Sequence, residues 1–192
     1  MRKLLLIAAL ILTPAANAQT KPPPKPATEV IIGSSRAPLP QRDAEYIGII
    51  QNTRRQYAAA RSVDARRNTR MAMQSAVHNF MGLSHKAQDW VGVFKDSKMN
   101  PDGTQSLEIE IAPSVIIATW DNPASDTTYY TRIKQLSALG KLIDDLQIGD
   151  DVTFSADLIG TVVSTDDDMV ARPQIIARFS ALKKIEPPAP AK

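Results

Sequence analysis

The chain of 192 residues contains no cysteine, only two histidines and few aromatic residues, which make up 5% of the sequence. Without cysteine it can form no disulfide and no thiolate metal ligand, so the core must hold the fold together unaided. A Gly-x-Ser-x-Gly elbow, a Gly-rich phosphate loop and a His-Glu-x-x-His pair are also absent. These absences argue against an enzyme, and we expect no catalytic residue and no cofactor.

The two histidines, His78 and His85, are seven residues apart, with Gly82 between them. They lie on roughly one face if a helix continues past Gly82. No carboxylate stands at ligand spacing beside them, so the pattern favours a structural or solvated role over metal ligation. The acidic runs at 144–151 and 166–168 lack the spacing of a calcium loop and favour solvated loops over a cation site. We therefore predict no metal site.

A hydrophobic run long enough to cross a membrane is also missing. The longest apolar stretch near the start, 4–12, follows Arg2 and Lys3 and has nine residues, whereas a membrane-spanning helix needs about 20. Pro14 and small residues ending at Ala18 follow it, which is the layout of a secretory signal. We predict a signal peptide over 1–18, cleaved after Ala18, a periplasmic or secreted protein, and no transmembrane segment after cleavage.

Charge is nearly balanced overall but unevenly distributed. The formal net charge of +3 falls to +1 once the two basic residues of the predicted signal are removed. Residues 42–86 carry a net charge of +5, and residues 126–168 carry −6. The distribution therefore bears on possible partners more than the total charge does.

Proline marks the ends of the chain. Six prolines fall within 19–40, and the last residues, 187–192, are also rich in proline. Proline fixes φ and removes a backbone donor, so we predict a disordered, polyproline-like tether over 19–41 and a similar tail over 187–192. The sequence EVIIG at 29–33 interrupts the tether, either as a short strand or as part of a solvated linker.

Residues 42–85 contain no proline and are rich in alanine, arginine, glutamine and methionine, which are good helix formers. We predict a basic helical segment there, either one long helix or two helices with a break near Asn68. Four apolar residues at helical spacing are expected to pack against the following domain: Met73, Ala76, Val77 and Phe80. A thinner apolar stripe lies upstream of them: Tyr46, Ile50, Tyr57 and Ala60.

We predict a β-rich domain over 86–186, and from Asp89 the hydrophobic period changes to two, which is typical of strands. DWVGVF and SLEIEIA flank the turn sequence Asn-Pro-Asp-Gly, and SVIIATW follows them. A helix is predicted over 132–147 from its apolar residues at spacings of three and four, and two more strands are predicted in DDVTFSADLIG and QIIARFSALKKI. The order is three strands, a helix and two strands.

This order is that of an OB-fold, a five-stranded Greek-key barrel with a helix between strands three and four. We therefore expect an α+β chain in which a β-barrel follows the Arg-rich helical segment. A β-sandwich is the alternative, but it usually needs about seven strands. Only five are visible in the sequence.

Several of these strings resemble a particular family. DWVGVF, LEIEI, VIIATW, LQIGDDVTFSADLIG and QIIARFSALKKI are similar to the bacterial tRNA-anticodon-binding-like OB-fold family, whose members are small and often exported. The resemblance covers 73–185, and Phe94 stands where such a first strand often has a smaller residue. It implies an OB-fold and carries no established activity, so tRNA binding is not implied.

OB-folds bind single-stranded nucleic acid through aromatic side chains on strands two and three beside a basic groove. Here strand two presents Glu108 and Glu110, which argues against nucleic-acid binding, and Trp90 and Phe94 are expected in the core. We predict a ligand-binding rim that contains Trp120, Asp102, Tyr129 and Tyr130. The leading hypothesis is a non-enzymatic module that binds a protein of the cell envelope or a small ligand there.

The arginines of the helical segment form a second candidate surface, for contact with a partner or an anion: Arg54, Arg55, Arg61, Arg66, Arg67 and Arg70. They favour, as an alternative hypothesis, an electrostatic adaptor at an anionic membrane or envelope surface. A third hypothesis is single-stranded nucleic-acid binding. A solvated charged face with no binding role also remains open.

Overall fold

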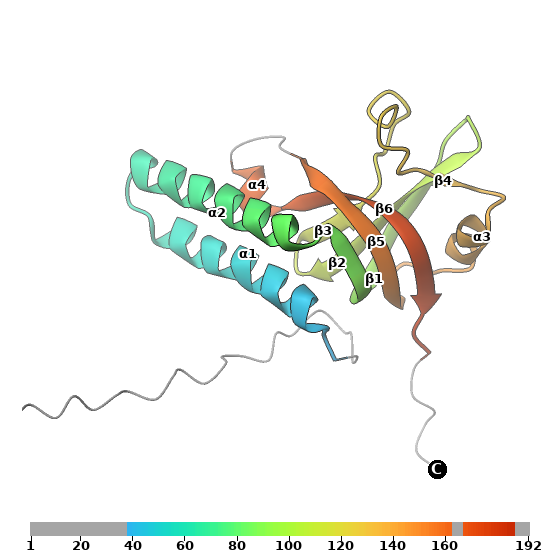
Figure 1. Cartoon of the computed structure of the whole chain (residues 1–192), viewed down its shortest axis with the longest axis horizontal. Helices are drawn as coiled ribbons and strands as arrows, with labels where there is room; N and C mark the ends of the chain where they lie inside the picture. Colours follow the sequence, from blue (N-terminus) through green and yellow to red (C-terminus); the bar gives the residue numbers. More distant parts are fainter. Residues whose placement is uncertain (1–37, 163–166, 187–192) are drawn as a thin grey trace, which may run out of the picture.

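The computed structural model describes residues 38–162 and 167–186, and this part begins with two antiparallel helices (Figure 1). They are α1 (Gln41–Ala59) and α2 (Val63–Leu83). Helix α2 begins after Ser62, whose hydroxyl accepts a hydrogen bond of 3.1 Å from the backbone N–H of Ala65, a standard N-cap. The segment therefore forms two helices. The expected break near Asn68 is wrong, because that residue lies inside α2 and the capped start at Ser62 sets the boundary.

The helices are followed by a six-stranded mixed sheet and two short helices, so the fold is α+β. Its strands are β1 (Lys86–Met99), β2 (Thr104–Ala112), β3 (Val115–Ala118), β4 (Ile133–Lys134), β5 (Asp151–Val162) and β6 (Gln174–Lys184). The strand order is β1-β5-β6-β3-β2-β4, and β1 also pairs with β2, so five strands pair in a closed ring. All pairings are antiparallel except that of β3 with β6.

The first hairpin forms as the sequence predicts. The backbone N–H of Asn100 donates to the carbonyl oxygen of Thr104 at 2.7 Å, and Gly103 takes a φ of +76°, which favours glycine. On β2, Leu107, Ile109 and Ile111 are fully buried. Strict alternation with a buried apolar face fixes the register of this hairpin.

The predicted helix over 132–147 is wrong in its first part. Ile133 lies in β4, where it pairs with Gln105 of β2, and the helix α3 (Ala138–Asp144) begins only after Ser137. The hydroxyl of Ser137 accepts from the N–H of Gly140 at 3.1 Å, which caps the shorter helix. Leu136, one of the apolar residues at spacings of three and four that predicted the longer helix, is 86% exposed. Ile133 of β4 and the apolar residues of α3 together have the spacing of one longer helix, which is why the sequence predicted one. A further short helix, α4 (Asp168–Ala171), lies in the expected loop before β6.

Aromatic side chains join the helices to the sheet in one core. Trp90 is 1% exposed, and its ring centroid lies 6.1 Å from that of Tyr46, 6.3 Å from that of Phe80 and 6.3 Å from that of Phe154. Phe94 is 3% exposed. The expectation that Trp90 and Phe94 belong to the core is confirmed. Of the apolar residues predicted at helical spacing, five are buried with them (Tyr46, Ile50, Met73, Val77 and Phe80), whereas Tyr57, Ala60 and Ala76 are only half-buried.

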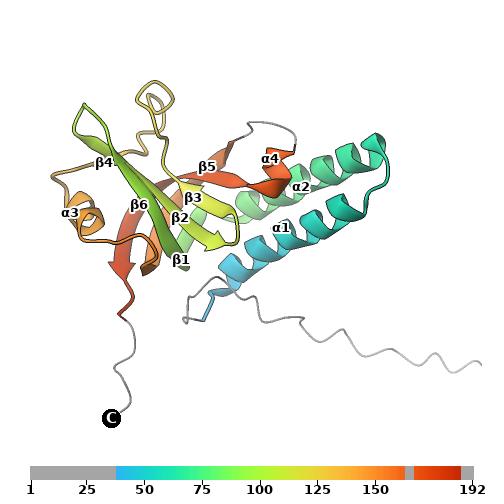
Figure 2. The same ribbon diagram turned by 180° about the vertical axis from the view of Figure 1, so that it is seen from behind.

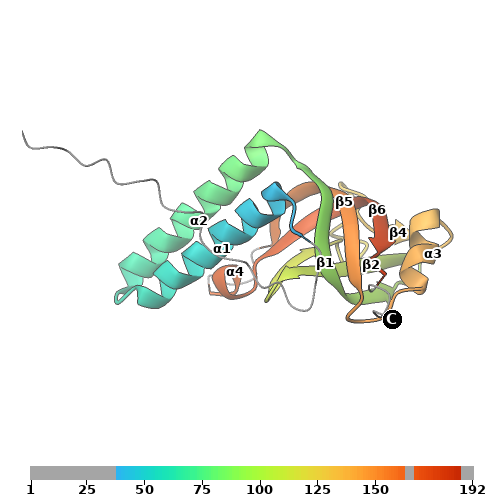
Figure 3. The same ribbon diagram turned by 90° about the horizontal axis from the view of Figure 1, so that it is seen from below.

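The helical pair lies at one end of the sheet and α3 at the other, as the views from behind and from below show (Figures 2 and 3). The turn between α1 and α2 is the part of this pair farthest from the strands. No helix in the described residues is long and apolar enough to span a bilayer. The predicted signal peptide, most of the tether and the tail lie outside the described residues.

Candidate binding site

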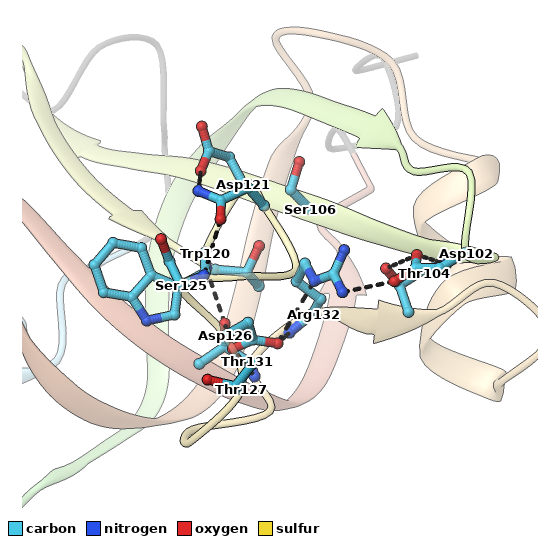
Figure 4. Close-up of polar contacts among 12 residues, drawn as sticks. Asp102, Thr104, Ser106, Trp120, Asp121, Ser125, Asp126, Thr127, Thr131 and Arg132 are labelled. Carbon is cyan, nitrogen blue, oxygen red and sulfur yellow. Dashed lines mark hydrogen bonds and ion pairs between the residues drawn. The ribbon is translucent and has the colours of Figure 1, made fainter.

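Two loops meet at one edge of the sheet and form what we call the rim: the β1–β2 turn at 100–103 and the loop at 119–132 (Figure 4). All four predicted ligand residues lie on it. Asp102 belongs to the turn, and Trp120, Tyr129 and Tyr130 belong to the loop. Hydrogen bonds and ion pairs hold the two loops of the rim together.

Asp126 organises the longer loop. Its Oδ1 accepts hydrogen bonds from the backbone N–H and the hydroxyl of Thr131 at 2.6 and 2.8 Å, and its Oδ2 accepts from the backbone N–H of Arg132 at 3.0 Å. The residue is only 6% exposed. A buried carboxylate that accepts several hydrogen bonds fixes a loop strongly, because each lost bond leaves a desolvated acceptor.

Arg132 joins this loop to the β1–β2 turn. Its Nη2 donates to Oδ2 of Asp102 at 2.7 Å, and its Nε lies 3.6 Å from Oδ2 of Asp126. The side chain is 8% exposed, and Nη1 has no hydrogen-bond partner among the described residues. The pKa of Asp102 is held below its usual value, first by the hydrogen bond from the Thr104 hydroxyl and then by Arg132. The guanidinium therefore binds two carboxylates from different loops.

Trp120 joins the same network through its backbone, since its N–H donates to the Thr131 hydroxyl at 2.8 Å. Its indole Nε1 is buried without a hydrogen-bond partner among the described residues. Tyr130 is also held by its backbone, which donates to the carbonyl oxygen of Asp126 at 3.0 Å and takes a φ of +50°. The Tyr129 and Tyr130 side chains are 45% and 73% exposed. The network thus fixes the backbone beneath two exposed aromatic side chains.

Sequence reasoning missed Asp126 and Arg132, the residues that connect the predicted set. One signal was present: Arg132 is the only arginine between Arg70 and Arg172, and it ends a polar loop that contains an aspartate. Its position just after Thr131 and before a buried isoleucine could have marked it as a structural charge. Only the structure shows that its partners are Asp102 and Asp126.

Negative charge lies near the rim. Glu108, half-buried on β2, has a raised pKa because of its burial and, in smaller part, because Asp96 and Asp121 lie near it. Glu110 forms an ion pair with Lys95 at 3.2 Å, so its charge is partly offset. Strand β2 therefore presents acidic side chains, as the sequence predicts, and Glu108 lies near Asp121 of the rim.

The six arginines of the predicted partner or anion surface differ in their contacts. Arg54 binds four backbone carbonyls, those of Pro113, Ser114, Val170 and Ala171, at 2.7 to 3.2 Å. It therefore connects α1 to the β2–β3 turn and to α4.

Two other arginines lie around Tyr57. The guanidinium carbon of Arg66 lies 5.6 Å from the Tyr57 ring centroid, and Arg70 hydrogen-bonds to the Tyr57 hydroxyl. Arg55, Arg61 and Arg67 are exposed. Arg66 is exposed as well, so four arginines of the set are exposed close to the α1–α2 turn in the sequence.

His78 and His85 both line a cavity of about 550 Å³ between α2 and the end of β5. Within the described residues, no group of three or more histidines, aspartates or glutamates is placed to hold a metal ion. The two histidines are therefore features of a cavity wall, away from the rim.

Comparison with known proteins identifies no relative from which a role of the rim could be inferred. No family model matches the chain, and no curated protein or solved structure is significantly similar to it.

Proposed function

We propose that the chain is an exported, non-enzymatic binding module with an OB-fold, which contacts a protein partner of the cell envelope through the rim. The closed ring in the order β1, β2, β3, β6, β5 and the position of α3 before β5 support the OB-fold assignment. Export rests on the sequence of 1–18. The assignment to the tRNA-anticodon-binding-like family rests on the short strings quoted above and stays a prediction.

The observation that carries this proposal is the connection of Asp102 to Trp120 through Arg132, Asp126 and Thr131 (Figure 4). Preorganised loops bind with less loss of conformational freedom than loops that must order on binding. Tryptophan, tyrosine and arginine are also the residues that most often dominate interface energy. Exposed tyrosines on a fixed backbone therefore suit a protein partner better than a small ligand, which prefers a concave pocket.

The charge around the rim indicates the chemistry of the partner. Asp96 and Asp121 both lie near Glu108, whose pKa is raised first by its burial and then by these two carboxylates. Such a surface attracts a basic partner and repels nucleic acid. We therefore propose a partner surface rich in lysine or arginine, bound with an affinity that falls as salt is added.

Affinity capture from an envelope extract tests the proposal. The immobilised protein is compared with a Tyr129→Ser/Tyr130→Ser variant and with Lys183→Ser, an exposed control on β6. We expect one basic protein to be retained by the wild type and by the control, lost from the double variant, and eluted by moderate salt. Equal retention by all three proteins would contradict a role for the rim.

A second candidate function, contact with an anionic surface, is supported by the tip of the helical pair. Arg55, Arg61 and Arg67 are exposed there, beside Val63, which is 84% exposed. Cationic side chains next to an exposed apolar one are typical of segments that touch a lipid surface. The tip also lies far from the rim, so both contacts are geometrically compatible (Figure 1).

Sedimentation with vesicles tests this second function. We expect the protein to sediment with vesicles that contain anionic lipid at low salt, and not with neutral vesicles. Replacing Arg55, Arg61 and Arg67 by glutamine should abolish binding, whereas replacing Arg178 and Lys183, two exposed residues of β6, should not. Binding that persists in the triple variant would exclude the tip.

A further inference from the structure

The cavity beside α2 lies outside the proposed rim and is lined by an apolar helix face. Met73, Val77 and Met81 of α2 and Met169 of α4 contribute to its wall and are 3%, 4%, 7% and 4% exposed. The opposite wall is the end of β5, 159–162. Polar residues also line the cavity, among them Gln74, His78 and Gln174, and its volume of about 550 Å³ is large enough to take several side chains.

The wall formed by β5 is an open strand edge. Strand β1 pairs with β5 only as far as Asp157, and the last contact on that side is from the N–H of Leu158 to the carbonyl oxygen of His85 at 2.6 Å. Beyond Leu158, β5 continues to Val162 and pairs with β6 on its other side. No strand among the described residues pairs with the cavity side of 159–162. An added β-carbon on Gly160 would meet no atom within 4 Å, so there is room along this edge.

An open edge beside apolar side chains is a site for an added strand. Extended segments bind such edges through backbone hydrogen bonds, while alternate side chains enter the neighbouring pockets. Proteins usually cover such edges, because an exposed one pairs readily with other chains. The occupant should therefore be short, extended and rich in β-branched residues.

The chain itself contains such a segment. Thr28 is followed by Glu29, Val30, Ile31, Ile32 and Gly33 within the proline-rich region that precedes α1. Val30 and Ile32 would point to one side of an extended segment and Ile31 to the other. Valine and isoleucine favour strands, and three in succession are unusual in a solvated linker.

The geometry of α1 brings this segment within reach of the cavity. Arg42 Nη2 donates to the carbonyl oxygen of Ser84 at 3.0 Å, and the next residue, His85, lines the cavity. The start of α1 is therefore close to His85, one of the residues that line the cavity. From Pro38 back to Val30 there are eight peptide units, which span up to roughly 26 Å when extended.

We propose that residues 29–33 of the same chain add to the open edge of β5 and place apolar side chains in the cavity beside α2. The segment thereby covers the edge and links the region after the predicted signal to the folded part. It also competes with any other apolar occupant of the cavity. This inference is independent of the rim and of the function proposed for it.

Disulfide trapping tests the proposal, and the cysteine-free chain gives a clean background. The full chain carrying Ile32→Cys and Thr161→Cys is oxidised, and Ile32→Cys with Lys183→Cys serves as the control. We expect an intramolecular disulfide in the first variant, in a monomer, and none in the control. A disulfide-linked dimer would instead show exchange of the segment between two copies, and no disulfide would show an empty edge; either result overturns the proposal.

Hydrogen exchange gives a second readout that does not depend on engineered cysteines. In the full chain, Val30→Ser/Ile32→Ser should speed amide exchange over 160–162 by at least about tenfold, while the amides of 152–158 stay protected and show that the fold is intact. Thr28→Ser is the matched control and should change neither region. Unchanged exchange over 160–162 in the double variant overturns the proposal.

Discussion

Arg54 Nη1 donates a hydrogen bond of 2.7 Å to the carbonyl oxygen of Pro113, which joins α1 to the turn between β2 and β3. The same guanidinium also reaches the carbonyls of Ser114, Val170 and Ala171. One side chain therefore holds three parts of the chain together. Most of its donors are used inside the molecule, and it offers little to a partner.

Replacing Arg54 should cost stability rather than binding. Hydrogen bonds to a charged group contribute about 1.5 to 3 kcal/mol, so we predict that Arg54→Ala lowers the free energy of unfolding by about 2 kcal/mol. The adjacent Arg55 is exposed, and Arg55→Ala should change it by less than about 0.5 kcal/mol. Urea denaturation measures both. Similar values for the two variants would show that the Arg54 contacts contribute nothing.

Replacing Arg132 should lower the free energy of unfolding more than replacing an arginine of a surface ion pair does. Removing one member of a buried ion pair typically costs about 3 to 5 kcal/mol, because the other charge stays buried. We predict a loss near the lower end for Arg132→Met, since Asp102 is 42% exposed and only Asp126 is buried. Arg178, whose side chain is 55% exposed beside Asp157, is the control. Arg178→Met should cost less than about 1 kcal/mol, and equal losses would count against the buried pair.

The stability of the protein should depend on pH through Asp43. This residue is fully buried, accepts from the backbone N–H of Val91 at 3.2 Å, and burial raises its pKa from 3.8 to about 7. The folded protein then binds a proton more tightly than the unfolded chain does. The free energy of unfolding must therefore fall as pH rises from about 4 to about 7, and level off above that.

The size of this effect is up to about 4 kcal/mol, because each pKa unit corresponds to about 1.4 kcal/mol. Asp43→Asn should remove this part of the pH dependence, whereas Asp64→Asn, at an exposed position in α2, should keep it. Chemical denaturation at pH 5, 6, 7 and 8 measures the slope. A wild-type slope that Asp43→Asn leaves unchanged would assign the dependence to other groups.

Replacing Gly140 by alanine should lower the stability of the protein, whereas replacing Gly48 by alanine should raise it. A β-carbon on Gly140 would lie 2.4 Å from the carbonyl oxygen of Gln135 and 2.5 Å from that of Lys134, so Gly140→Ala must displace α3 from β4. We predict a loss of about 2 kcal/mol or more. Gly48 in α1 has open space, and Gly48→Ala should raise stability by about 0.5 to 1 kcal/mol. Thermal unfolding distinguishes the two outcomes, and a stabilising Gly140→Ala would contradict the packing of α3.

The strand pattern and the core were accessible from the sequence because alternation is a local property. Leu107, Ile109 and Ile111 alternate with polar residues over a whole strand, and the turn before them has its own chemistry. The helix over 132–147 was misjudged because Ile133 and Ile143 are both buried but belong to different elements. Spacing alone does not show that a strand pair intervenes.

The candidate site was only partly predictable, for a different reason. Asp102 lies in the predicted turn and Trp120 at the end of a predicted strand, so the sequence indicated both side chains. Their connection depends on Arg132 meeting an aspartate thirty residues earlier in the chain, which no local pattern encodes. The contacts of Arg54 could not be predicted for the same reason, since its carbonyl partners lie 59, 60, 116 and 117 residues away in the sequence.

Site-specific photocross-linking from the rim tests the central claim most directly. A photoreactive amino acid is placed at Tyr130, or at Lys183 as the control, and the chain is irradiated in its native cell envelope. The account predicts one specific adduct with a basic protein from position 130, weakened when Arg132→Met releases the loop and absent from position 183. Identical adducts from both positions, or none from position 130, would contradict the rim as the binding surface.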